Sequence, residues 1–427
     1  MDPPAAAACP ALQRLLLPAG VDPAALPLLL ALGLRALGDG CMAVLLPSYL
    51  LALGLGTLQV GLVSTATLLG SALATLAVGA WGHRWPGLRL LRAAAWLMAA
   101  TGLALAGLSA FWPLLAVAFV GTLNPSAGDV SVFLPLEHAR LAAAAQGHAR
   151  TALFARYSLV GALCAAVGAL AAGLPDLLAR ALGLAPQVAL RGMFVGYGLL
   201  GLAVWCLYRA PAGAAARIDA AGAAAAPAMA QARAAPLGAS RAVVLRLALL
   251  FSVDAFAGGL LVNALMALWL LQRFGISLAQ AGVFFAATGL LGAASQLAAP
   301  LLARRIGLLH TMVFTHIPAN ACLVLAALVP SWPLALGLLL LRAALSQMDV
   351  PTRTAFVMAV VTPAERAAAA SFTAVPRSLA SAISPTLSAA LLAAGWLAAP
   401  LVACGLLKIG YDLALWLAMR RHRLDGT

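Results

Sequence analysis

The sequence predicts an all-α polytopic membrane protein with twelve transmembrane helices in two pseudo-symmetric six-helix bundles. Three observations carry this prediction: an apolar composition with few charges, twelve long apolar runs, and a repeat that relates the two halves of the chain. Of the 427 residues, 64% are hydrophobic and 9% are charged, whereas soluble domains have about 25% charged residues. So few charges cannot cover a soluble protein of this length, which excludes soluble, disordered and coiled-coil classes.

Twelve apolar runs are each long enough to cross a bilayer. A transmembrane helix needs about 20 mostly apolar residues, because the hydrocarbon core of a bilayer is about 30 Å thick. The expected spans are 25–53, 57–80, 90–110, 113–136, 151–174, 190–209, 242–271, 278–302, 308–329, 333–361, 370–394 and 398–419. The lipid bilayer is therefore the expected surrounding of most of the chain.

The connection between the sixth and seventh runs differs from the other connections. It is rich in alanine and contains three prolines, so it is too interrupted to span a membrane. We expect a cytoplasmic linker there, either disordered or partly helical along the membrane surface. The predicted domains are a cytoplasmic N-terminus (1–24), an N-terminal six-helix bundle (25–209), the linker (210–241), a C-terminal six-helix bundle (242–419) and a cytoplasmic C-terminus (420–427).

Arginines set the expected orientation of the spans. They concentrate in the turns after the even-numbered spans and after the last span, whereas the opposite turns hold little beyond Arg180 and Arg273, with Arg191 at the border. The positive-inside rule then places both termini in the cytoplasm. The formal net charge of +14 thus reflects membrane topology and not nucleic-acid binding. Only one of the 26 basic residues is a lysine, which suggests a GC-rich bacterial source and hence the cytoplasmic (inner) membrane.

An internal repeat relates the two halves of the chain. One constant spacing takes Gly54, Gln59 and Gly61 to Gly275, Gln280 and Gly282. The same spacing relates Arg84 to Arg305 and Arg156 to Arg377, and Asp129 matches Asp349 at a spacing shorter by one. Because each half has an even number of spans, both halves face the same way and are related by an axis along the membrane normal. Two such bundles are expected to enclose a central cavity.

The segment Gly79–Arg89 resembles the cytoplasmic signature of the major facilitator superfamily, with His83 at the position where that family usually has Asp. Residues 346–377 are similar to bacterial members that are described only as exporters. The resemblance covers nearly the whole chain. It implies a secondary transporter in which helices 1, 4, 7 and 10 line the cavity, and it gives gating roles to Arg84 and Arg305.

Charged residues inside the spans are the candidate functional residues, because a charge at the bilayer centre costs at least about 2.5–3.5 kcal/mol. Arg35 and Asp39 are four residues apart and so share one face of span 1. Asp254 lies in span 7, at a similar depth. We predict that Asp39 and Asp254 carry protons. The alternative for Asp39 is neutralisation by Arg35, which is itself a candidate for substrate binding.

Spans 4 and 10 are interrupted at matching places. Asn124 precedes Pro125 in span 4, and Gln347, Asp349 and Arg353 flank Pro351 in span 10. Interrupted helices at matching positions of two repeats are a pointer to a transporter's binding site. We therefore predict that the polar side chains at the two breaks contact substrate, and the alternative is a packing kink without a ligand. The wall of the predicted cavity would also include Tyr49, Asn263 and Trp269.

Two repeated pairs of opposite charge lie at similar depth in the cytoplasmic third of the membrane. They are Asp129 with Arg156 in the N-terminal half and Asp349 with Arg377 in the C-terminal half. We predict gates that break and reform during transport, and the alternative is a structural ion pair in each half. In span 12, Lys408 and Asp412 are four residues apart and are expected to form a structural pair, and His316 in span 9 is expected to be a packing residue.

The function that these observations indicate is secondary active transport, with proton antiport driving export of a small solute. No phosphate-binding GxxxxGK loop and no GxSxG or HExxH motif occurs, so we expect neither an enzyme nor a bound cofactor or metal, and we expect a monomer. A second hypothesis is an anionic substrate, such as phosphate or an organic anion, held by Arg35 and Arg353. A divalent metal exporter using Asp39, Cys41 and Met42, and a non-transporting sensor or lipid-handling scaffold, are weaker alternatives.

Overall fold

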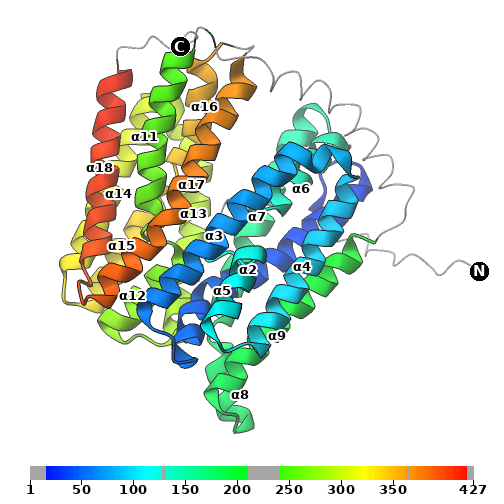
Figure 1. Ribbon diagram of the computed structural model, residues 1–427. Coiled ribbons are helices and arrows are strands. Elements are labelled where there is room, and N and C mark those ends of the chain that lie inside the picture. Colours follow the sequence, from blue (N-terminus) through cyan, green and yellow to red (C-terminus); the bar gives the residue numbers. More distant parts are fainter. Residues whose placement is uncertain (1–15, 127–130, 210–237, 239, 363–364, 421–427) are drawn as a thin grey trace, which may run out of the picture.

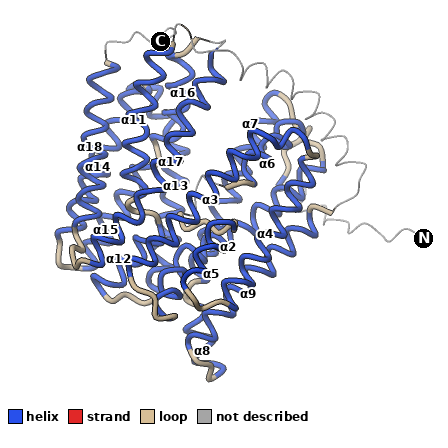
Figure 2. The backbone as a smooth tube through the Cα atoms, viewed as in Figure 1, coloured by secondary structure: helices blue, strands red, loops and turns tan. Residues whose placement is uncertain are grey.

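The structure is a computed structural model that describes residues 16–126, 131–209, 238, 240–362 and 365–420. Within these ranges every regular element is a helix and no strand occurs (Figures 1 and 2). The all-α prediction is therefore confirmed. Asp129, most of the linker and both ends of the chain lie outside the described residues.

The helices form two groups that correspond to the two halves of the sequence. The N-terminal half contains α2 (Leu26–Ala52), α3 (Thr57–Trp81), α4 (Gly87–Gly107), α5 (Phe111–Val120), α6 (Phe133–Ala144), α7 (Gly147–Ala171), α8 (Leu174–Leu182) and α9 (Pro186–Leu207). The C-terminal half contains α11 (Arg241–Gly259), α12 (Asn263–Phe274), α13 (Leu278–Ile306), α14 (Leu308–Leu328), α15 (Trp332–Ser346), α16 (Asp349–Val360), α17 (Arg366–Ala393) and α18 (Ala399–Met419).

Ten segments of the described chain are long and apolar enough to cross a membrane. They correspond to ten of the twelve predicted spans. The other two predicted spans correspond to α5 with α6, which residues 121–132 separate, and to α17. Length and apolarity therefore support a polytopic membrane protein and account for most, but not all, of the predicted count.

Each half contains the same pairs of packed helices. Helix α2 packs along α7, and α11 packs along α17 in the same way. A Cβ atom on Gly40 would overlap the Ala165 carbonyl oxygen, and one on Gly259 would overlap the Ser381 carbonyl oxygen. Only glycine allows such close approach of two backbones. Since Gly40 and Gly259 are related by nearly the same spacing as the repeat in the sequence, the packing of the helices repeats as well.

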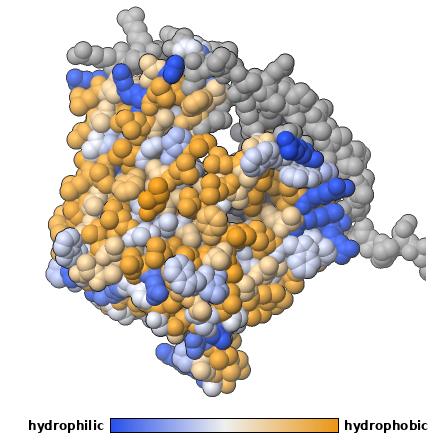
Figure 3. Space-filling view, in the orientation of Figure 1, coloured by the Kyte–Doolittle hydropathy of each residue, from blue (hydrophilic) through white to orange (hydrophobic). Residues whose placement is uncertain are grey.

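The molecule has two distinct ends. The arginine-rich end carries exposed guanidinium groups at Arg84, Arg89, Arg150, Arg209, Arg241, Arg304, Arg305, Arg366 and Arg420. The opposite end carries the connections 53–56, 108–110, 172–185, 275–277, 329–331 and 394–398. In Figure 1 the arginine-rich end is at the top, and the two bundles diverge toward it. Figure 3 shows the surface hollowed between the bundles at that end.

The two bundles meet close to the opposite end, where α3 packs on α17 and α7 packs on α13. A Cβ atom on Gly61 would overlap the Ala389 Cβ, and one on Gly282 would overlap the Ala169 carbonyl oxygen. The Thr386 hydroxyl donates to the Thr65 hydroxyl at 2.8 Å. Gly61 and Gly282 each lie four residues inside a helix from this end, so the repeated glycines of the sequence form the contact between the halves.

Large apolar side chains cover the sides of the molecule. Leu249, Leu297 and Leu301 are each about two-thirds exposed, at 68%, 68% and 67%, and Figure 3 shows apolar residues between the two polar ends. A soluble monomer rarely exposes so much contiguous apolar surface. The surface is the one expected of a protein whose sides face lipid.

Candidate functional site

Three of the membrane-crossing segments are interrupted within the described chain. The break between α15 and α16 falls at Gln347–Met348, and α5 and α6 are separated around Asn124, as the sequence predicts. A third break, at residues 260–262 between α11 and α12, was not predicted. The backbone N–H of Ala264 at the start of α12 donates to the Pro125 carbonyl oxygen at 3.1 Å. The breaks of spans 4 and 7 therefore touch each other across the two halves.

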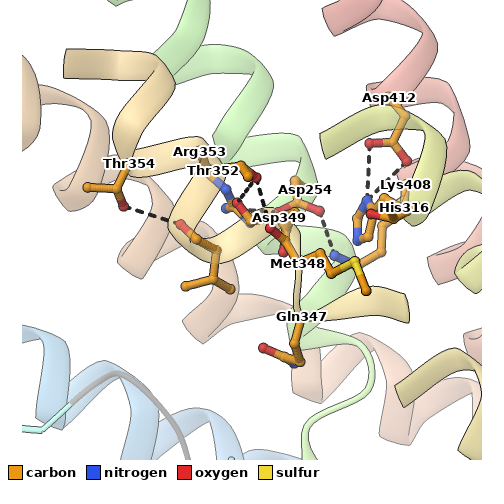
Figure 4. Close-up of polar contacts among 12 residues, drawn as sticks. Asp254, His316, Gln347, Met348, Asp349, Thr352, Arg353, Thr354, Lys408 and Asp412 are labelled. Atoms are coloured by element: carbon orange, nitrogen blue, oxygen red, sulfur yellow. Dashed lines mark hydrogen bonds and ion pairs between the residues drawn. The ribbon is translucent and has the colours of Figure 1, made fainter. Parts of the chain in front are cut away.

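Six ionisable side chains from four helices form what we call the C-terminal charge cluster. They are Asp254 on α11, His316 on α14, Asp349 and Arg353 on α16, and Lys408 and Asp412 on α18 (Figure 4). All six are buried. Such groups are expensive inside a membrane protein and must be paired with one another or face a polar space.

Asp254 lies at the centre of the C-terminal charge cluster. One of its carboxylate oxygens accepts a hydrogen bond from the Lys408 ammonium at 2.5 Å, and the other accepts from the Arg353 guanidinium at 3.2 Å. Arg353 also donates to Asp349, one helical turn earlier on α16. The carboxylate of Asp254 therefore joins α11 to both α16 and α18.

His316 and Asp412 form the outer part of the C-terminal charge cluster. The Nδ1 atom of His316 lies 3.0 Å from each carboxylate oxygen of Asp412 (Figure 4). The predicted Lys408–Asp412 pair is therefore wrong, because Lys408 binds Asp254 and Asp412 binds His316. Asp349 forms an ion pair with Arg353, and its predicted pairing with Arg377 stays a prediction.

A second buried ion pair lies in the N-terminal half. Arg35 on α2 contacts Glu137 on α6 at 2.5 Å, and Glu137 also accepts hydrogen bonds from the hydroxyls of Tyr157 and Tyr208, each at 2.5 Å. The guanidinium carbon of Arg35 lies 4.1 Å from the centre of the Phe133 ring. Glu137 is fully buried, and its three donors come from three different helical segments, so it is a central tie of this bundle.

Asp39 forms no ion pair with Arg35 in the described chain, although the two residues share a face of α2. The guanidinium of Arg35 turns to Glu137, and Asp39 accepts a hydrogen bond from the Tyr197 hydroxyl at 3.2 Å. Among the described residues no ion pair holds Asp39, which is half-buried. Asp39 therefore differs from Asp254, which two cations hold.

The two ion pairs occupy equivalent places with opposite polarity. Arg35 and Asp254 are separated by the same number of positions as the packing glycines Gly40 and Gly259. In the N-terminal half a cation on the first helix meets an anion on the fourth span. In the C-terminal half an anion on the first helix meets a cation, Arg353, on the equivalent span.

Three further residues that were predicted to contact substrate are polar side chains close to the helix breaks. Asn124 is buried, and its side-chain oxygen accepts hydrogen bonds from the backbone and hydroxyl of Ser126. Gln347 points away from the C-terminal charge cluster (Figure 4) and accepts from the Gln296 amide at 3.3 Å. Asn263 is half-buried at the first position of α12. All three side chains therefore lie at or beside the helix breaks.

Tyr49 and Trp269 are packed inside their bundles. The Tyr49 hydroxyl donates to the Leu105 carbonyl oxygen at 2.5 Å, and its ring lies 4.3 Å from the Phe194 ring. Trp269 is fully buried on α12, with its ring edge-on to Phe274. Both side chains are therefore buried in the packing of their bundles.

The predicted gating residues are only partly described. Asp129 lies outside the described residues, so its pairing with Arg156 stays a prediction. Arg156 on α7 and Arg377 on α17 are half-buried. Arg84 and Arg305 are exposed at the arginine-rich end, one in each half. These last two positions agree with the repeat but do not test a gating role.

Glu365 lies at the arginine-rich end, outside the membrane-crossing segments, just before α17. Its carboxylate accepts hydrogen bonds from the backbone N–H groups of Gly238 at 2.7 Å and Ser240 at 3.0 Å. Hydrogen bonds from the Ser240 side chain and the Gly238 backbone stabilise the charged form and so lower the pKa of Glu365. Glu365 thereby ties the start of α11 to the connection that precedes α17.

Sequence reasoning missed Glu137 as a central residue and misjudged His316. The available signal was the charge itself, because a carboxylate within an apolar run needs a partner. Tyr157 and Tyr208 gave no signal, since tyrosine is common near membrane interfaces. For the third helix break, the signal was the pair Gly258–Gly259. As for metals, the described residues contain no group of three or more His, Cys, Asp or Glu side chains that could hold an ion.

Comparison with known proteins agrees with this geometry. Residues 28–346 match the family model of the Major Facilitator Superfamily. An uncharacterized membrane protein of Saccharomyces cerevisiae is 24% identical over 407 residues, which cover 90% of this chain and 91% of the yeast protein.

Solved structures with the same fold include three transporters. A bacterial homologue of the human lysosomal transporter Spinster, inward-facing and occupied, has a TM-score of 0.69 and 17% identity over 93% of this chain and 96% of that chain. The nucleoside transporter NupG has a TM-score of 0.70 and 14% identity over 94% and 100%. The human organic anion transporter TETRAN has a TM-score of 0.60 and 20% identity over 92% and 98%. Because the family model covers well over half of the sequence, the chain belongs to the Major Facilitator Superfamily and is a membrane transporter, not an enzyme.

Proposed function

We propose that the protein is a proton-coupled antiporter that exports a small solute across the cytoplasmic (inner) membrane of a bacterium, acting as a monomer. The arginine-rich end, with both termini, faces the cytoplasm in this proposal. The exposed arginines at that end support the orientation, because cytoplasmic loops of membrane proteins carry an excess of Arg and Lys. Transport proceeds by alternating access, with the two bundles rocking around a central site.

The contacts between the halves support alternating access. In the described residues these contacts gather near the opposite end, at Gly61, Thr65 and Gly282, while the bundles diverge toward the arginine-rich end (Figure 1). In the proposed orientation this is a state open to the cytoplasm. The structurally similar Spinster homologue was likewise solved in an inward-facing conformation.

The observation that carries the proposal is the C-terminal charge cluster beside the break of span 10. Three carboxylates, two permanent cations and one histidine are buried together there, which a purely structural core rarely retains. We propose that Asp349 and Arg353 contact the solute together with Gln347, Asn124, Asn263 and Arg35, and that Tyr49 and Trp269 shape the wall. Asp129 with Arg156, Arg377, Arg84 and Arg305 close the cytoplasmic side.

Asp39 and Asp254 are the proposed coupling residues. Asp39 accepts a hydrogen bond from a neutral hydroxyl and forms no ion pair among the described residues. A carboxylate in that setting takes up a proton at little electrostatic cost. Asp254 takes part through its two cations, because any change in its charge alters the attraction between α11, α16 and α18.

The test is transport by the purified protein in proteoliposomes that contain a pH-sensitive dye. Nucleosides, sugars and organic anions are offered in turn, since transporters of these classes share the fold. A transported solute should move protons in the opposite direction in the wild type. Asp254→Asn should reduce that proton movement at least about tenfold, which corresponds to about 1.4 kcal/mol.

Asp176→Asn on α8 is the matched control, because Asp176 lies outside the C-terminal charge cluster and the Arg35–Glu137 ion pair, so the variant should behave as the wild type. Solute transport without proton movement in the wild type would remove the coupling proposal. Unchanged coupling in both Asp39→Asn and Asp254→Asn would remove the residue assignment and leave the coupling proposal in place.

An anionic substrate is the second candidate, and the observation that bears on it is the state of the two arginines. Arg35 and Arg353 are both bound to carboxylates, so an anion would have to displace one of them. Exchange of a carboxylate for a substrate anion is chemically reasonable, since Arg binds both in the same bidentate way. Arg353→Lys should then abolish transport of an anion and spare a neutral solute.

The remaining alternatives gain no support. Cys41 and Met42 are buried, and the described residues contain no group of three or more candidate metal ligands. A sensor or lipid-handling scaffold would not need the contact between the breaks of spans 4 and 7. Export of an organic solute therefore remains the function that the geometry supports best.

A further inference from the structure

We propose that the His316–Asp412 pair is the proton-exchanging site of the C-terminal half, and that Lys408 transmits its protonation state to Asp254. The inference rests on the proposed proton coupling and names the residues through which it acts. It assigns a role in proton coupling to α14 (span 9) and α18 (span 12), the helices that carry the pair.

The geometry of the pair suits reversible proton binding. Nδ1 of His316 is 3.0 Å from both oxygens of Asp412, so an Nδ1–H group would be shared between them. The side chains are 5% and 1% exposed. The Tyr411 ring lies edge-on to the imidazole at 6.5 Å. Histidine is the side chain whose charge changes most readily near neutral pH.

The charge balance of the C-terminal charge cluster depends on this histidine. Asp254, Asp349 and Asp412 supply three negative charges, whereas Arg353 and Lys408 supply two positive charges. A protonated His316 makes the cluster neutral, and loss of the proton leaves one excess negative charge. An excess charge is costly in a buried site, so proton loss must shift the neighbouring groups.

Other charged groups lie on the helices around His316. Arg342 on α15 is half-buried, and its charge acts on Cys404 of α18, but among the described residues it forms no ion pair with the cluster. His310 on α14, and Arg304 and Arg305 on α13, are exposed at the arginine-rich end. The groups that contact one another directly are therefore those of the cluster itself.

Asp254 is a poorer proton acceptor than the pair. Two cations hold its carboxylate, at 2.5 and 3.2 Å, and protonation would leave both of them without a counter-charge. Asp412 accepts from His316, and no permanent cation contacts it among the described residues. Proton uptake by the pair therefore disturbs fewer buried contacts than proton uptake by Asp254.

Lys408 lies where its ammonium group can respond to the charge of the His316–Asp412 pair. It precedes Asp412 by one turn of α18, so the two side chains are neighbours on one face, yet its ammonium binds Asp254. When the pair loses its proton, the uncompensated Asp412 carboxylate attracts Lys408 away from Asp254. A Cβ atom on Gly258 would lie 3.6 Å from the Lys408 Nζ atom. The lysine thus lies beside the break between α11 and α12, and its movement acts at that break.

The experiment measures the conformational equilibrium of the full-length protein in nanodiscs as a function of pH. Spin labels are placed on Thr151→Cys of α7 and Ala355→Cys of α16, two exposed sites near the arginine-rich end, in a background without the six native cysteines. The wild-type distance distribution should shift between about pH 5.5 and about pH 8.5, a range that brackets ordinary histidine titration. His316→Gln should abolish the shift, because Gln still donates to Asp412 but does not titrate.

His310→Gln is the matched control, since His310 lies on the same helix, is exposed and stacks on Phe314. It should keep the full shift. Lys408→Met should also abolish the shift, while infrared difference spectra still show the imidazole titrating. Loss of the infrared signal in His316→Gln and its retention in Lys408→Met would separate proton binding from transmission.

A pH-dependent shift that persists in His316→Gln would overturn the inference. So would an imidazole that does not titrate in the wild type. Failure of the proposed proton coupling gives a different result. Wild-type proteoliposomes would then transport solute without moving protons, independently of the spin-label distances. If His316→Gln unfolds, Asp412→Asn provides the second variant, and it should lose the same shift.

Discussion

Glu137 shows, at the scale of single residues, how a carboxylate is accommodated inside this protein. It accepts three hydrogen bonds, from Arg35, Tyr157 and Tyr208, and no part of it is exposed. Hydrogen bonds to a charged group are stronger than those between neutral groups. In contrast to Asp412 of the C-terminal charge cluster, Glu137 accepts no hydrogen bond from a histidine in the described chain, and both of its carboxylate oxygens accept hydrogen bonds. We therefore interpret it as a structural tie and not as a coupling site.

Glu137→Gln is expected to destabilise the protein. The change leaves the buried Arg35 guanidinium without a counter-charge, and breaking a buried ion pair in this way costs about 3–5 kcal/mol. The apparent melting temperature of the detergent-solubilised protein should fall clearly, whereas Asp176→Asn should leave it unchanged. A melting temperature equal to that of the wild type would contradict the structural role.

Glu365 makes the stability of the arginine-rich end depend on pH. Because its pKa is lowered in the folded protein, its stabilising contribution is complete above the ordinary glutamate pKa of about 4.3 and is lost as the pH falls through the folded value. The wild type should therefore be more stable than Glu365→Gln at pH 7, and the difference should shrink in acid. Melting curves of both proteins at several pH values test this, and a difference that grows in acid would refute it.

The partners of buried charges were the least predictable part of the site. Sequence shows which residues are one turn apart on a helix, so it predicted a pair of Lys408 with Asp412 and gave pairing with Arg35 as the alternative for Asp39. The structure instead pairs Arg35 with Glu137 and Lys408 with Asp254. Both true partners lie on other helices, and their distances depend on how the helices pack. No local pattern in a single sequence contains that information.

At the scale of helices, the interruptions are the features closest to function. Proline predicted the breaks in spans 4 and 10, because it removes a backbone donor and disfavours a helical residue before it. The break between α11 and α12 follows Gly258 and Gly259, and glycine is too frequent in membrane helices to mark a break by itself. The long continuous helices were predictable from apolar length alone, since the bilayer fixes the number of residues required.

Gly61 and Gly282 allow a direct test of the contact between the halves. Gly61→Leu and Gly282→Leu should each prevent close packing at the opposite end, because even a Cβ atom would overlap the facing helix. Both variants should shift the spin-label distances toward the state that is closed at the arginine-rich end, and transport should fall at least about tenfold.

Gly79→Leu on α3 and Gly289→Leu on α13 are the matched controls. A Cβ atom at either position meets nothing within 4 Å, so both variants should transport as the wild type does. Equal loss of transport in the control and test variants would show that bulk on the helix, and not the contact between the halves, causes the defect.

At the scale of the whole molecule, the proposed orientation predicts which sites can be labelled from outside a cell. In a background without native cysteines, Gly183→Cys after α8 should react with a membrane-impermeant thiol reagent applied to intact cells. Arg89→Cys at the start of α4 should react only after the membrane is opened. The reverse labelling pattern would show that the arginine-rich end faces outward. It would contradict the proposed orientation and the direction of transport that depends on it.

The contact between the two bundles, where α3 packs on α17 and α7 packs on α13, has a consequence for how the transporter is controlled. Glycine, alanine and threonine make it, and among the described residues no ion pair joins one half to the other. A contact made of small side chains, backbone and neutral hydrogen bonds depends little on ionic strength. Opening of this contact must therefore be driven from inside a bundle, by the tilt of a whole helix. A change of charge at the contact itself would not open it.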